Sequence, residues 1–459
     1  MTENSAARVE DALNLVFLAA GKGTRMASAR AKVLHEVGGL SLLGHALAGA
    51  RPLNPQRVAV VVGHDGDSVA AEAARLWPGA AVARQEAQLG TGHAVLSARG
   101  LLEGATGDVL VLYGDSPFVS AGTLRRLIAA RRAGAAVGVL GFEPEAPGGY
   151  GRLKLGPDGG LEAIVEAKDA TPEEAAIRLC NSGVMILPAE KIFGWLERLT
   201  PSNVKGEYYL TDLVAMARAE GLPCVAVRAE AEEVLGVNSR AELAEAEALF
   251  QQRRRREILD SGVTMTAPET VFLSYDARIE PDVEIEPHVV FGPGVHVKSG
   301  ARIRAFSHLE GAEVASGAVV GPYARLRPGA KIGEGAHVGN FVELKNATLG
   351  PGAKANHLAY LGDATVGAKA NIGAGAITAN YDGVFKHRTE IGEGAFIGSN
   401  AVLIAPISVG AGALVAAGSA ASKDVPAEAL SVTRSEQKIL PGAAARLRAR
   451  LRAAKAAKS

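Results

Sequence analysis

A glycine-rich stretch near the N-terminus has the residue types that bind a polyphosphate. Leu18 to Met26 reads Leu-Ala-Ala-Gly-Lys-Gly-Thr-Arg-Met and directly follows an apolar run. Glycines let the backbone turn its amide groups inward, while Lys22 and Arg25 supply positive charge. The spacing fits neither the Walker A loop nor the GxGxxG fingerprint. A lone GxG turn would be only a loop, but the whole string is more specific and predicts a phosphate site.

A second candidate is an acidic residue after another apolar run. Asp115 lies in Tyr113-Gly114-Asp115-Ser116-Pro117, directly after the segment Asp108 to Tyr113. A carboxylate at the end of a strand is a hard oxygen ligand of the kind that Mg²⁺ prefers. The alternative is that Asp115 is a turn residue that caps the strand.

A third candidate is His357, one of ten histidines. It lies shortly before an irregular segment, Thr378 to Glu390, which contains the turn sequence Asn380-Tyr381-Asp382-Gly383. A neutral imidazole can act as a general base. The residues alone favour the alternative, an ordinary surface or core histidine whose ring has a structural partner.

Strands and helices alternate around the first two candidates. The expected strands are Leu15 to Leu18, Val58 to Val62, Asp108 to Tyr113 and Ala136 to Leu140, and the expected helices include Ser41 to Arg51 and Ala121 to Arg132. Such alternation predicts a mostly parallel sheet covered on both faces, with ligands at the carboxyl ends of the strands.

The C-terminal half is a repeat. From Ile279 to about Ala420 an aliphatic residue recurs at every sixth position, as at Val320, Leu326 and Ile332, and a glycine often follows it. This period suits a short strand followed by a tight corner, so that three strands make one triangular coil. Coils then stack at roughly 4.8 Å, with aliphatic side chains inside and glycines at the corners. The period is suspended through Thr378 to Glu390, which must therefore bulge outward; a purely structural solenoid is the alternative to a catalytic one.

Two further segments connect and end these regions. Ser239 to Asp260 predicts one helix, with Ser239 as N-cap and Glu242 placed for a capping box. Its run Arg253 to Arg256 is better explained as a solvated face or a subunit contact than as a nucleic-acid patch. The basic tail Ala443 to Ser459 is either a short helix or a disordered end, and disorder is the safer interpretation. The expected domains are residues 1–238, a linker helix at 239–262, and residues 263–459.

Composition excludes several classes of protein. The chain has 459 residues, which is long enough for two or more domains, and its 48% hydrophobic and 21% charged residues are typical of an ordinary soluble protein. Lys and Arg total 49 against 49 for Asp and Glu, so no global charge attracts nucleic acid or membrane. Two cysteines, Cys180 and Cys224, exclude a disulfide framework and favour a reducing cytoplasm. The apolar run Leu15 to Ala20 is too short for a signal peptide or a membrane span.

The motifs together resemble known families. Leu18 to Met26, Lys32-Val33-Leu34-His35, Gly90-Thr91-Gly92-His93 and Tyr113 to Pro117 resemble the signature positions of the sugar-1-phosphate nucleotidyltransferases. The repeat resembles the left-handed parallel β-helix of the hexapeptide-repeat acyltransferases. Over essentially its whole length the chain resembles the bacterial bifunctional enzymes that make UDP-N-acetylglucosamine. The implied fold is a Rossmann-like α/β nucleotidyltransferase domain, a linker helix and a left-handed β-helix.

For the first domain the resemblance implies uridylyl transfer from UTP to N-acetylglucosamine-1-phosphate. The sugar phosphate is already ionised, so this chemistry needs charge neutralisation by Mg²⁺ and cations rather than a base. The resemblance makes Arg25 catalytic and gives Asp115 and Asn238 to the metal. The implied nucleotide and sugar contacts are Leu18, Ala19, Ala20, Gly21, Lys32, Gln85, Gly90, Thr91, Tyr113, Gly151, Glu166, Asn181 and Asn238.

For the β-helix the resemblance implies acetyl transfer from acetyl-CoA to glucosamine-1-phosphate. His357 is then the general base for the amine, and Glu343 orients its imidazole. The implied sugar-phosphate contacts are Arg327, Lys345, Tyr360 and Asn371. The implied acetyl-CoA contacts are Ala374, Asn380, Tyr381, Ser399, Ala417 and Arg434, with a backbone amide near Ser399 or Asn380 for the oxyanion. We expect a cytoplasmic homotrimer with sites between subunits, small-molecule substrates, and no nucleic-acid or membrane partner.

Two other functions are open to such a chain. One is a nucleotidyltransferase whose β-helix only oligomerises it, and the joint presence of Arg327, Lys345 and His357 disfavours this. The other is a regulatory subunit that has both folds without catalysis, which the intact loop with Arg25 and Asp115 disfavours. The expected product would serve peptidoglycan and lipopolysaccharide synthesis.

Overall fold

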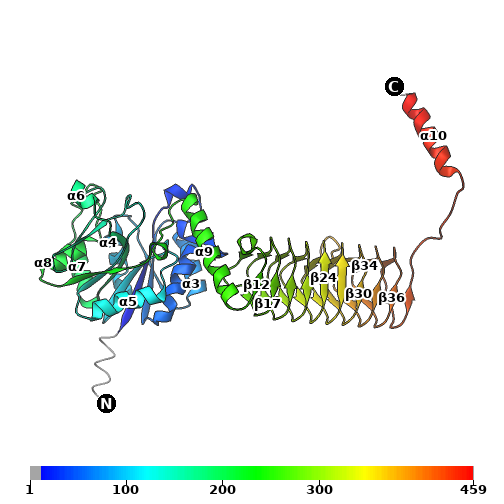
Figure 1. Cartoon of the computed structure of the whole chain (residues 1–459), viewed down its shortest axis with the longest axis horizontal. Helices are drawn as coiled ribbons and strands as arrows, with labels where there is room; N and C mark the ends of the chain where they lie inside the picture. Colours follow the sequence, from blue (N-terminus) through cyan, green and yellow to red (C-terminus); the bar gives the residue numbers. More distant parts are fainter. Residues whose placement is uncertain (1–11, 458–459) are drawn as a thin grey trace, which may run out of the picture. The chain divides into compact units, whose positions relative to one another are not determined.

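The computed structural model describes residues 12–457, so the outer ends of the first and last expected domains, residues 1–11 and 458–459, lie outside the described part. The chain divides after Arg254 into two compact units. Figure 1 shows that the first unit mixes helices with a sheet, and that the second is a row of short strands.

The first unit is built on a nine-stranded sheet in the order β11-β7-β10-β6-β1-β4-β5, with β8 and β9 beside this path. Its strands are β1 (Leu13–Ala19), β4 (Arg57–Val62), β5 (Ala81–Arg84), β6 (Asp108–Tyr113), β7 (Val137–Phe142), β8 (Arg152–Leu155), β9 (Leu161–Val165), β10 (Cys180–Pro188) and β11 (Cys224–Arg228). The pairs around β1 are parallel, as expected. The sequence did not predict β10, which runs antiparallel between β6 and β7.

Helices cover both faces of this sheet because successive residues of β1 point to opposite sides. Leu15 and Phe17 pack with α2, α3 and α5 in one core, whereas Val16 and Leu18 pack with α4, α7 and α8 in another. The helices are α2 (Leu42–Ala50), α3 (Gly66–Leu76), α4 (Thr91–Ser97), α5 (Ala121–Arg132), α6 (Pro172–Ala175), α7 (Ala189–Leu196) and α8 (Asp212–Ala219). Two short 3-10 turns, η1 (Thr24–Met26) and η2 (Lys32–Leu34), follow β1, and a hairpin of β2 (Glu36–Val37) and β3 (Leu40–Ser41) comes next. The expected sheet covered on both faces is therefore confirmed.

Helix α9 (Arg240–Asp260) begins in the first unit and ends in the second. Its start is the expected capping box, because Ser239 Oγ accepts from the Glu242 N–H while the Glu242 carboxylate accepts from the Ser239 N–H. Its arginines contact the chain itself: Arg253 pairs with Glu232 at 3.0 Å, and Arg256 pairs with Asp260 at 2.9 Å. Within residues 12–457 no helix is both long and apolar enough to cross a bilayer.

The second unit is a three-sided, left-handed parallel β-helix, which confirms the expected fold. The first face comprises β12 (Thr264–Met265), β15 (Glu284–Ile285), β18 (Arg302–Ile303), β21 (Val319–Val320), β24 (His337–Asn340), β27 (Lys354–His357), β30 (Asn371–Ile372), β33 (Phe396–Ile397), β36 (Leu414–Val415) and β38 (Leu430–Ser431). The second face comprises β13 (Phe272–Leu273), β16 (Val290–Phe291), β19 (His308–Leu309), β22 (Arg325–Leu326), β25 (Glu343–Lys345), β28 (Tyr360–Gly362), β31 (Ile377–Ala379), β34 (Val402–Ile404) and β37 (Ala420–Ala421). The third face comprises β14 (Arg278–Ile279), β17 (His296–Val297), β20 (Glu313–Val314), β23 (Lys331–Ile332), β26 (Thr348–Leu349), β29 (Ala364–Val366), β32 (Thr389–Ile391) and β35 (Ile407–Val409).

The sixfold aliphatic residues form the interior of this β-helix. Val320, Leu326 and Leu344 are completely buried in one continuous core. Many of the glycines that follow these aliphatic residues are required by the next coil rather than by a special backbone angle. A Cβ on Gly398 would lie 2.4 Å from the backbone nitrogen of Ala417, so only glycine lets adjacent coils approach at strand spacing.

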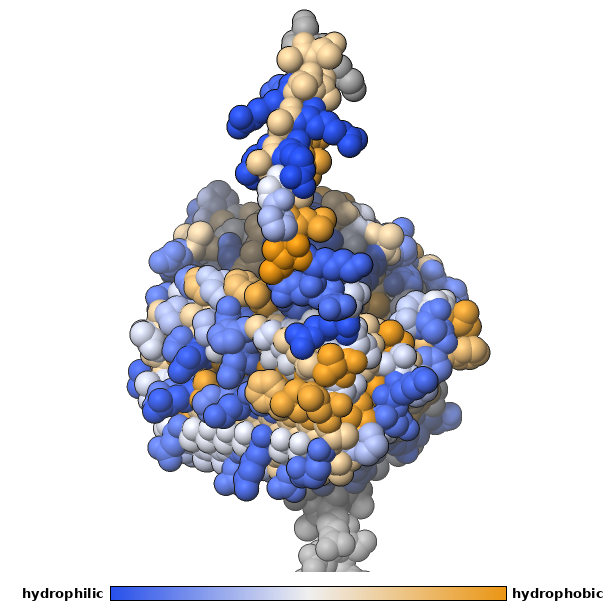
Figure 2. All heavy atoms as spheres, turned by 90° about the vertical axis from the view of Figure 1, so that its right-hand side faces the viewer, coloured by the Kyte–Doolittle hydropathy of each residue, from blue (hydrophilic) through white to orange (hydrophobic). Residues whose placement is uncertain are grey.

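The suspended period has the expected consequence. Strand neighbours Ile285 and Ile303 are 18 residues apart, whereas Ile372 and Ile397 are 25 apart. The extra residues form a loop, residues 380–388, between β31 and β32, closed by an antiparallel bridge between Tyr381 and Lys386. The chain ends in helix α10 (Ala443–Ala456), so the safer interpretation of the tail as disordered is wrong, because its alanines and arginines are strong helix formers. Figure 2 shows hydrophilic side chains projecting from this basic helix.

Candidate active sites

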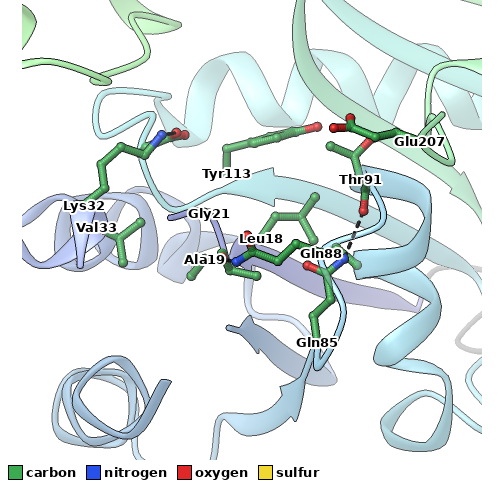
Figure 3. A pocket seen from close by; sticks show the side chains of 14 residues that line it. Leu18, Ala19, Gly21, Lys32, Val33, Gln85, Gln88, Thr91, Tyr113 and Glu207 are labelled. Atoms are coloured by element: carbon green, nitrogen blue, oxygen red, sulfur yellow. Dashed lines mark hydrogen bonds and ion pairs between the residues drawn. The ribbon is translucent and has the colours of Figure 1, made fainter. Parts of the chain in front are cut away.

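A cavity of about 280 Å³ opens in the first unit at the carboxyl ends of β1 and β6. Ten of the residues predicted to bind nucleotide, sugar or metal line it: Leu18, Ala19, Ala20, Gly21, Lys32, Gln85, Gly90, Thr91, Tyr113 and Asp115. Figure 3 shows Lys32 on one side of this space, Gln85 and Thr91 on the other, and Tyr113 extending between them. The edge of the sheet that parallel strands offer to ligands thus holds most of the predicted side chains.

The glycine-rich loop, whose Gly21 lines this cavity, has backbone donors without a protein partner. Within the described residues, the backbone N–H groups of Gly21, Lys22 and Gly23 donate to no protein acceptor. Gly23 adopts φ +60°, and a Cβ there would lie 2.6 Å from the Lys32 Cβ, so glycine is needed for both its angle and its proximity to Lys32. Arg25, on η1, is exposed to solvent. Unpaired N–H groups together with cations form a suitable environment for an anion.

Lys32, Asp115 and Asn238 form the charged centre of the site. The Lys32 ammonium pairs with the Asp115 carboxylate and donates to Asn238 Oδ1 at 2.9 Å. The lysine and aspartate side chains are only 11% and 18% exposed. The N–H of Val237 donates to the Asp115 carbonyl at 2.9 Å, which fixes the two oxygen-bearing side chains beside each other although 123 positions separate them in the chain.

Burial favours the uncharged form of the Tyr113 and Glu166 side chains. Burial raises the pKa of the Tyr113 phenol, and it raises the pKa of the Glu166 carboxyl, which accepts from Thr211 Oγ1 at 3.3 Å. A Cβ on Gly183 would lie 2.7 Å from the Tyr113 ring, so that glycine leaves room for the ring.

Four predicted contacts lie outside the residues that line the cavity: Gly151, Glu166, Asn181 and Asn238. Gly151 and Asn181 are joined, because the Asn181 N–H donates to the Gly151 carbonyl at 2.8 Å. Sequence reasoning missed Gln88 and Glu207, which do line the cavity. Gln88 Nε2 donates to the Ala20 carbonyl, a contact that no local motif signals.

In the second unit, a cluster of charged residues occupies the second face of the β-helix. Arg327 Nη1 donates to Glu343 Oε1 at 2.8 Å, and this bond raises the pKa of Arg327. One coil apart, Lys345 lies 3.4 Å from Asp363. Asp363 also accepts from Asn346 at 2.7 Å and from Asn380. Although burial opposes its ionisation, these hydrogen bonds lower the pKa of the Asp363 carboxyl.

The sequence reasoning also missed Lys386. This residue belongs to the inserted loop 380–388, and its ammonium faces that of Lys345, which lowers the pKa of Lys386. Arg327 adds to the same positive field. Three cations from two coils and one loop thus converge, as a phosphate dianion would require.

His357 lies at the end of β27 and has a different neighbour from the one expected. Its Nδ1 is 2.7 Å from Asn340 Oδ1, on the adjacent coil. Glu343, by contrast, is bonded to Arg327. Within one chain the structure therefore does not support the expectation that Glu343 orients His357, because the parallel register places Asn340 beside the imidazole and Glu343 beside Tyr360.

The remaining predicted acetyl-CoA contacts fall into two places. Beyond His357, successive coils are joined along the corner between the first and second faces: Gly375 donates to the His357 carbonyl, Asn400 to Ala374, and Gly418 to Ser399. Ala417 lies next along this corner, and Arg434 follows β38. Asn371, a predicted contact of the sugar phosphate, lies on β30, directly before this corner. Asn380 and Tyr381 lie instead at the corner between the second and third faces.

The two groups therefore occupy opposite edges of the second face. His357 precedes the three-residue strand β28, and Asp363 follows it. Three extended residues span about 10 Å. The corner between the first and second faces, which holds His357, is called the histidine corner. In one chain it lies on a different edge of the second face from the Lys345–Asp363–Asn380 corner, which is the corner between the second and third faces.

An exposed aromatic ridge, defined by Phe306, Tyr323 and Phe341, follows the histidine corner. Their rings stack with centroids 4.9 and 5.1 Å apart. Each ring is about half exposed, and Leu358, the residue after His357, continues the ridge at 59% exposure. Contiguous apolar side chains on a surface mark an interaction site.

Comparisons with known proteins find a family model for the first half of the chain and relatives that match nearly all of it. The family model described as the MobA-like NTP transferase domain matches residues 15–265. The bifunctional protein GlmU of Ruegeria sp. (strain TM1040) is 58% identical over 97% of this chain and 99% of its own length. GlmU of Azorhizobium caulinodans is 56% identical over 96% of this chain and 98% of its own length. A solved structure of UDP-glucose pyrophosphorylase complexed with UDP-glucose covers 53% of this chain and all of its own, at 20% identity and a TM-score of 0.45, too distant to support a conclusion.

The match to the GlmU proteins spans the cavity of the first unit, the linking helix and the β-helix with its inserted loop. The chain therefore belongs to the family of bifunctional GlmU proteins.

Proposed function

We propose that the two units of this chain each carry one of the two activities of a GlmU protein. The chain is a bifunctional transferase that makes UDP-N-acetylglucosamine, a precursor of the bacterial cell wall, by acetyl transfer from acetyl-CoA and uridylyl transfer from UTP. The assignment rests on one observation: the polyphosphate-type cavity lies wholly in the first unit, and the His357–Asn340 pair lies wholly in the second.

In the uridylyl step, an oxygen of N-acetylglucosamine-1-phosphate attacks the α-phosphorus of UTP. The bond from that phosphorus to its bridging oxygen breaks, and pyrophosphate leaves. The free N–H groups of Gly21 to Gly23 and the charge of Arg25 and Lys32 stabilise the phosphates. No general base is needed because the nucleophile is already ionised.

The donors at Asp115 and Asn238 fit a magnesium ion. They are a carboxylate and an amide oxygen, both hard ligands, and they already converge on one cation, the Lys32 ammonium. No cluster of three or more His, Cys, Asp or Glu ligands occurs in the part of the chain that is described, which suits a metal that takes its other ligands from substrate phosphates and water. When bound, Mg²⁺ would neutralise phosphate charge.

In the acetyl step, the amine of glucosamine-1-phosphate attacks the thioester carbon. The Asn340 oxygen accepts the Nδ1–H of His357, which leaves Nε2 free to take the proton of the amine as the C–N bond forms. The C–S bond then breaks, and the departing sulfur takes the proton from Nε2, so that CoA leaves as the thiol and His357 is neutral again. Arg327, Lys345 and Lys386 hold the sugar phosphate, with Tyr360 and Asn371 on the sugar. Glu343 keeps Arg327 in place instead of orienting the histidine.

We further propose that the acetyl site is completed in a homotrimer. The histidine corner of one copy would face the Lys345–Asp363–Asn380 corner of another, which brings together groups that one chain holds on opposite edges of the second face. The aromatic ridge beside His357 supplies an apolar surface for that contact. Phe341→Glu should convert the assembly to monomers in light scattering and abolish acetyl transfer while uridylyl transfer continues. A trimer that persists in this variant would exclude the ridge as the contact.

The activity assignment is tested with purified wild-type protein, acetyl-CoA and glucosamine-1-phosphate. Free thiol should appear only when the amino sugar is present. If no thiol appears while UTP and N-acetylglucosamine-1-phosphate still release pyrophosphate, the β-helix is only scaffolding. A cytoplasmic location, expected from the two unpaired cysteines, remains a prediction.

A further inference from the structure

The metal ligands of the uridylyl site are already occupied by a side chain of the protein. Lys32 Nζ contacts both the Asp115 carboxylate and Asn238 Oδ1, the latter at 2.9 Å, in a largely buried setting. A magnesium ion binds oxygen at about 2.0–2.1 Å. An ammonium and a metal ion cannot share these two oxygens, because each requires the same lone pairs and their charges repel each other.

We propose that Lys32 is a built-in cation that holds Asp115 and Asn238 together until nucleotide binds, and that it competes with the metal for them. This rests on the proposed magnesium site. When nucleotide phosphates enter the cavity, the Lys32 ammonium moves to them and the two oxygens become available to the metal.

The surroundings of Lys32 make both positions possible. Its side chain lines the same cavity as Gly21, whose N–H donates to no protein acceptor within the described residues. Gly23 leaves space against its Cβ. The ammonium would leave one anion for another, so neither state buries an unpaired charge. Without the lysine, the nucleotide-free protein would hold a carboxylate at 18% exposure with no cation.

Competition of this kind has a thermodynamic signature. Nucleotide and metal must bind cooperatively, because each removes an obstacle to the other, and part of this coupling passes through Lys32. Replacing the lysine by an uncharged residue removes the obstacle beforehand. The variant should therefore bind metal more tightly without nucleotide and gain less when nucleotide is added.

The test measures binding of Mn²⁺, a spectroscopic probe for the metal, to full-length protein by electron paramagnetic resonance and calorimetry. Without UTP, Lys32→Met should bind Mn²⁺ about tenfold to a hundredfold more tightly than wild type, as expected for losing a hydrogen-bonded charge pair. Saturating UTP should tighten Mn²⁺ binding by a larger factor in wild type than in Lys32→Met. Lys32→Arg, which keeps the charge, should stay near wild type. Unchanged or weaker Mn²⁺ binding in Lys32→Met would overturn the proposal.

Two controls separate this proposal from a general charge effect. Lys191→Met removes an exposed lysine that pairs with Glu220 and does not line the cavity, and it should leave Mn²⁺ affinity unchanged. The gain in Lys32→Met should vanish in Lys32→Met/Asp115→Asn, and a gain that persists would contradict competition at these oxygens. If UTP-dependent Mn²⁺ binding needs Asp115 but ignores Lys32, only the placeholder role fails. If it does not need Asp115 at all, the proposed metal site fails as well.

Discussion

Removing the oxygen that positions His357 should slow acetyl transfer without touching uridylyl transfer. The perturbation is Asn340→Ala, which deletes the acceptor 2.7 Å from His357 Nδ1. A hydrogen bond between neutral groups contributes about 0.5–1.5 kcal/mol. If that energy holds the imidazole in the productive tautomer and orientation, kcat should fall about twofold to tenfold, since about 1.4 kcal/mol corresponds to tenfold. The loss should be well below the roughly 10²- to 10⁴-fold expected for removing the base in His357→Ala.

The assay is release of CoA thiol at saturating acetyl-CoA over a range of glucosamine-1-phosphate. The reduction should appear in kcat and leave KM nearly unchanged, because Asn340 contacts the imidazole rather than the sugar phosphate. Asn340→Asp, which keeps an acceptor at the same place, should retain more activity than the alanine variant. Pyrophosphate release should be normal in both variants, because the uridylyl site lies in the other unit, and an unchanged Tm would show that the β-helix is folded.

The reasoning would be refuted by an Asn340→Ala variant with wild-type kcat. It would also be refuted if Glu343→Ala lowered kcat at constant KM, as expected for a residue that orients the base. The structure predicts instead that Glu343→Ala raises KM for the sugar phosphate, because it frees Arg327 from its 2.8 Å partner.

Three further predictions concern stability and reactivity. Burial raises the pKa of the Glu166 carboxyl above its ordinary 4.5, so above that pH the folded protein binds more protons than the unfolded protein does. The free energy of unfolding therefore falls as pH rises. Glu166→Gln should raise Tm more at pH 7 than at pH 4. Burial raises the pKa of the Cys224 thiol to about 11 and also raises that of Cys180, so both should react with iodoacetamide at pH 8 far more slowly in native than in denatured protein; equal rates would contradict the burial. Gly398→Ala places a Cβ 2.4 Å from the Ala417 nitrogen, so it should lower Tm and acetyl transfer while pyrophosphate release persists; an unchanged melting curve would show that the coils can separate at no cost.

Much of the fold could be predicted because its signals are local. The sixfold aliphatic period alone places Val320, Leu326 and Leu344 inside the β-helix, and it also locates the interruption that becomes loop 380–388. The capping box at Ser239 likewise depends only on residues three positions apart. Strand β10 could not be predicted, because its antiparallel place between β6 and β7 is decided by the whole sheet.

The candidate sites could be predicted where the residues that form them belong to one sequence motif or follow neighbouring strands. The loop from Leu18 to Met26 and Asp115 lie at the ends of adjacent parallel strands, so their meeting follows from the topology. Asn340 was missed, although the coil length offers a signal: it lies 17 residues before His357, one coil earlier. Lys386 gave no such signal, because residues in the inserted loop have no register with the coils.

The account's central claim is that two chemistries reside in separate units of one chain, and paired assays of two variants test it most directly. Asp115→Ala and His357→Ala are each measured for pyrophosphate release and for thiol release. The account predicts that Asp115→Ala loses pyrophosphate release and keeps thiol release, and that His357→Ala shows the reverse. Comparable loss of both activities in either variant would contradict it.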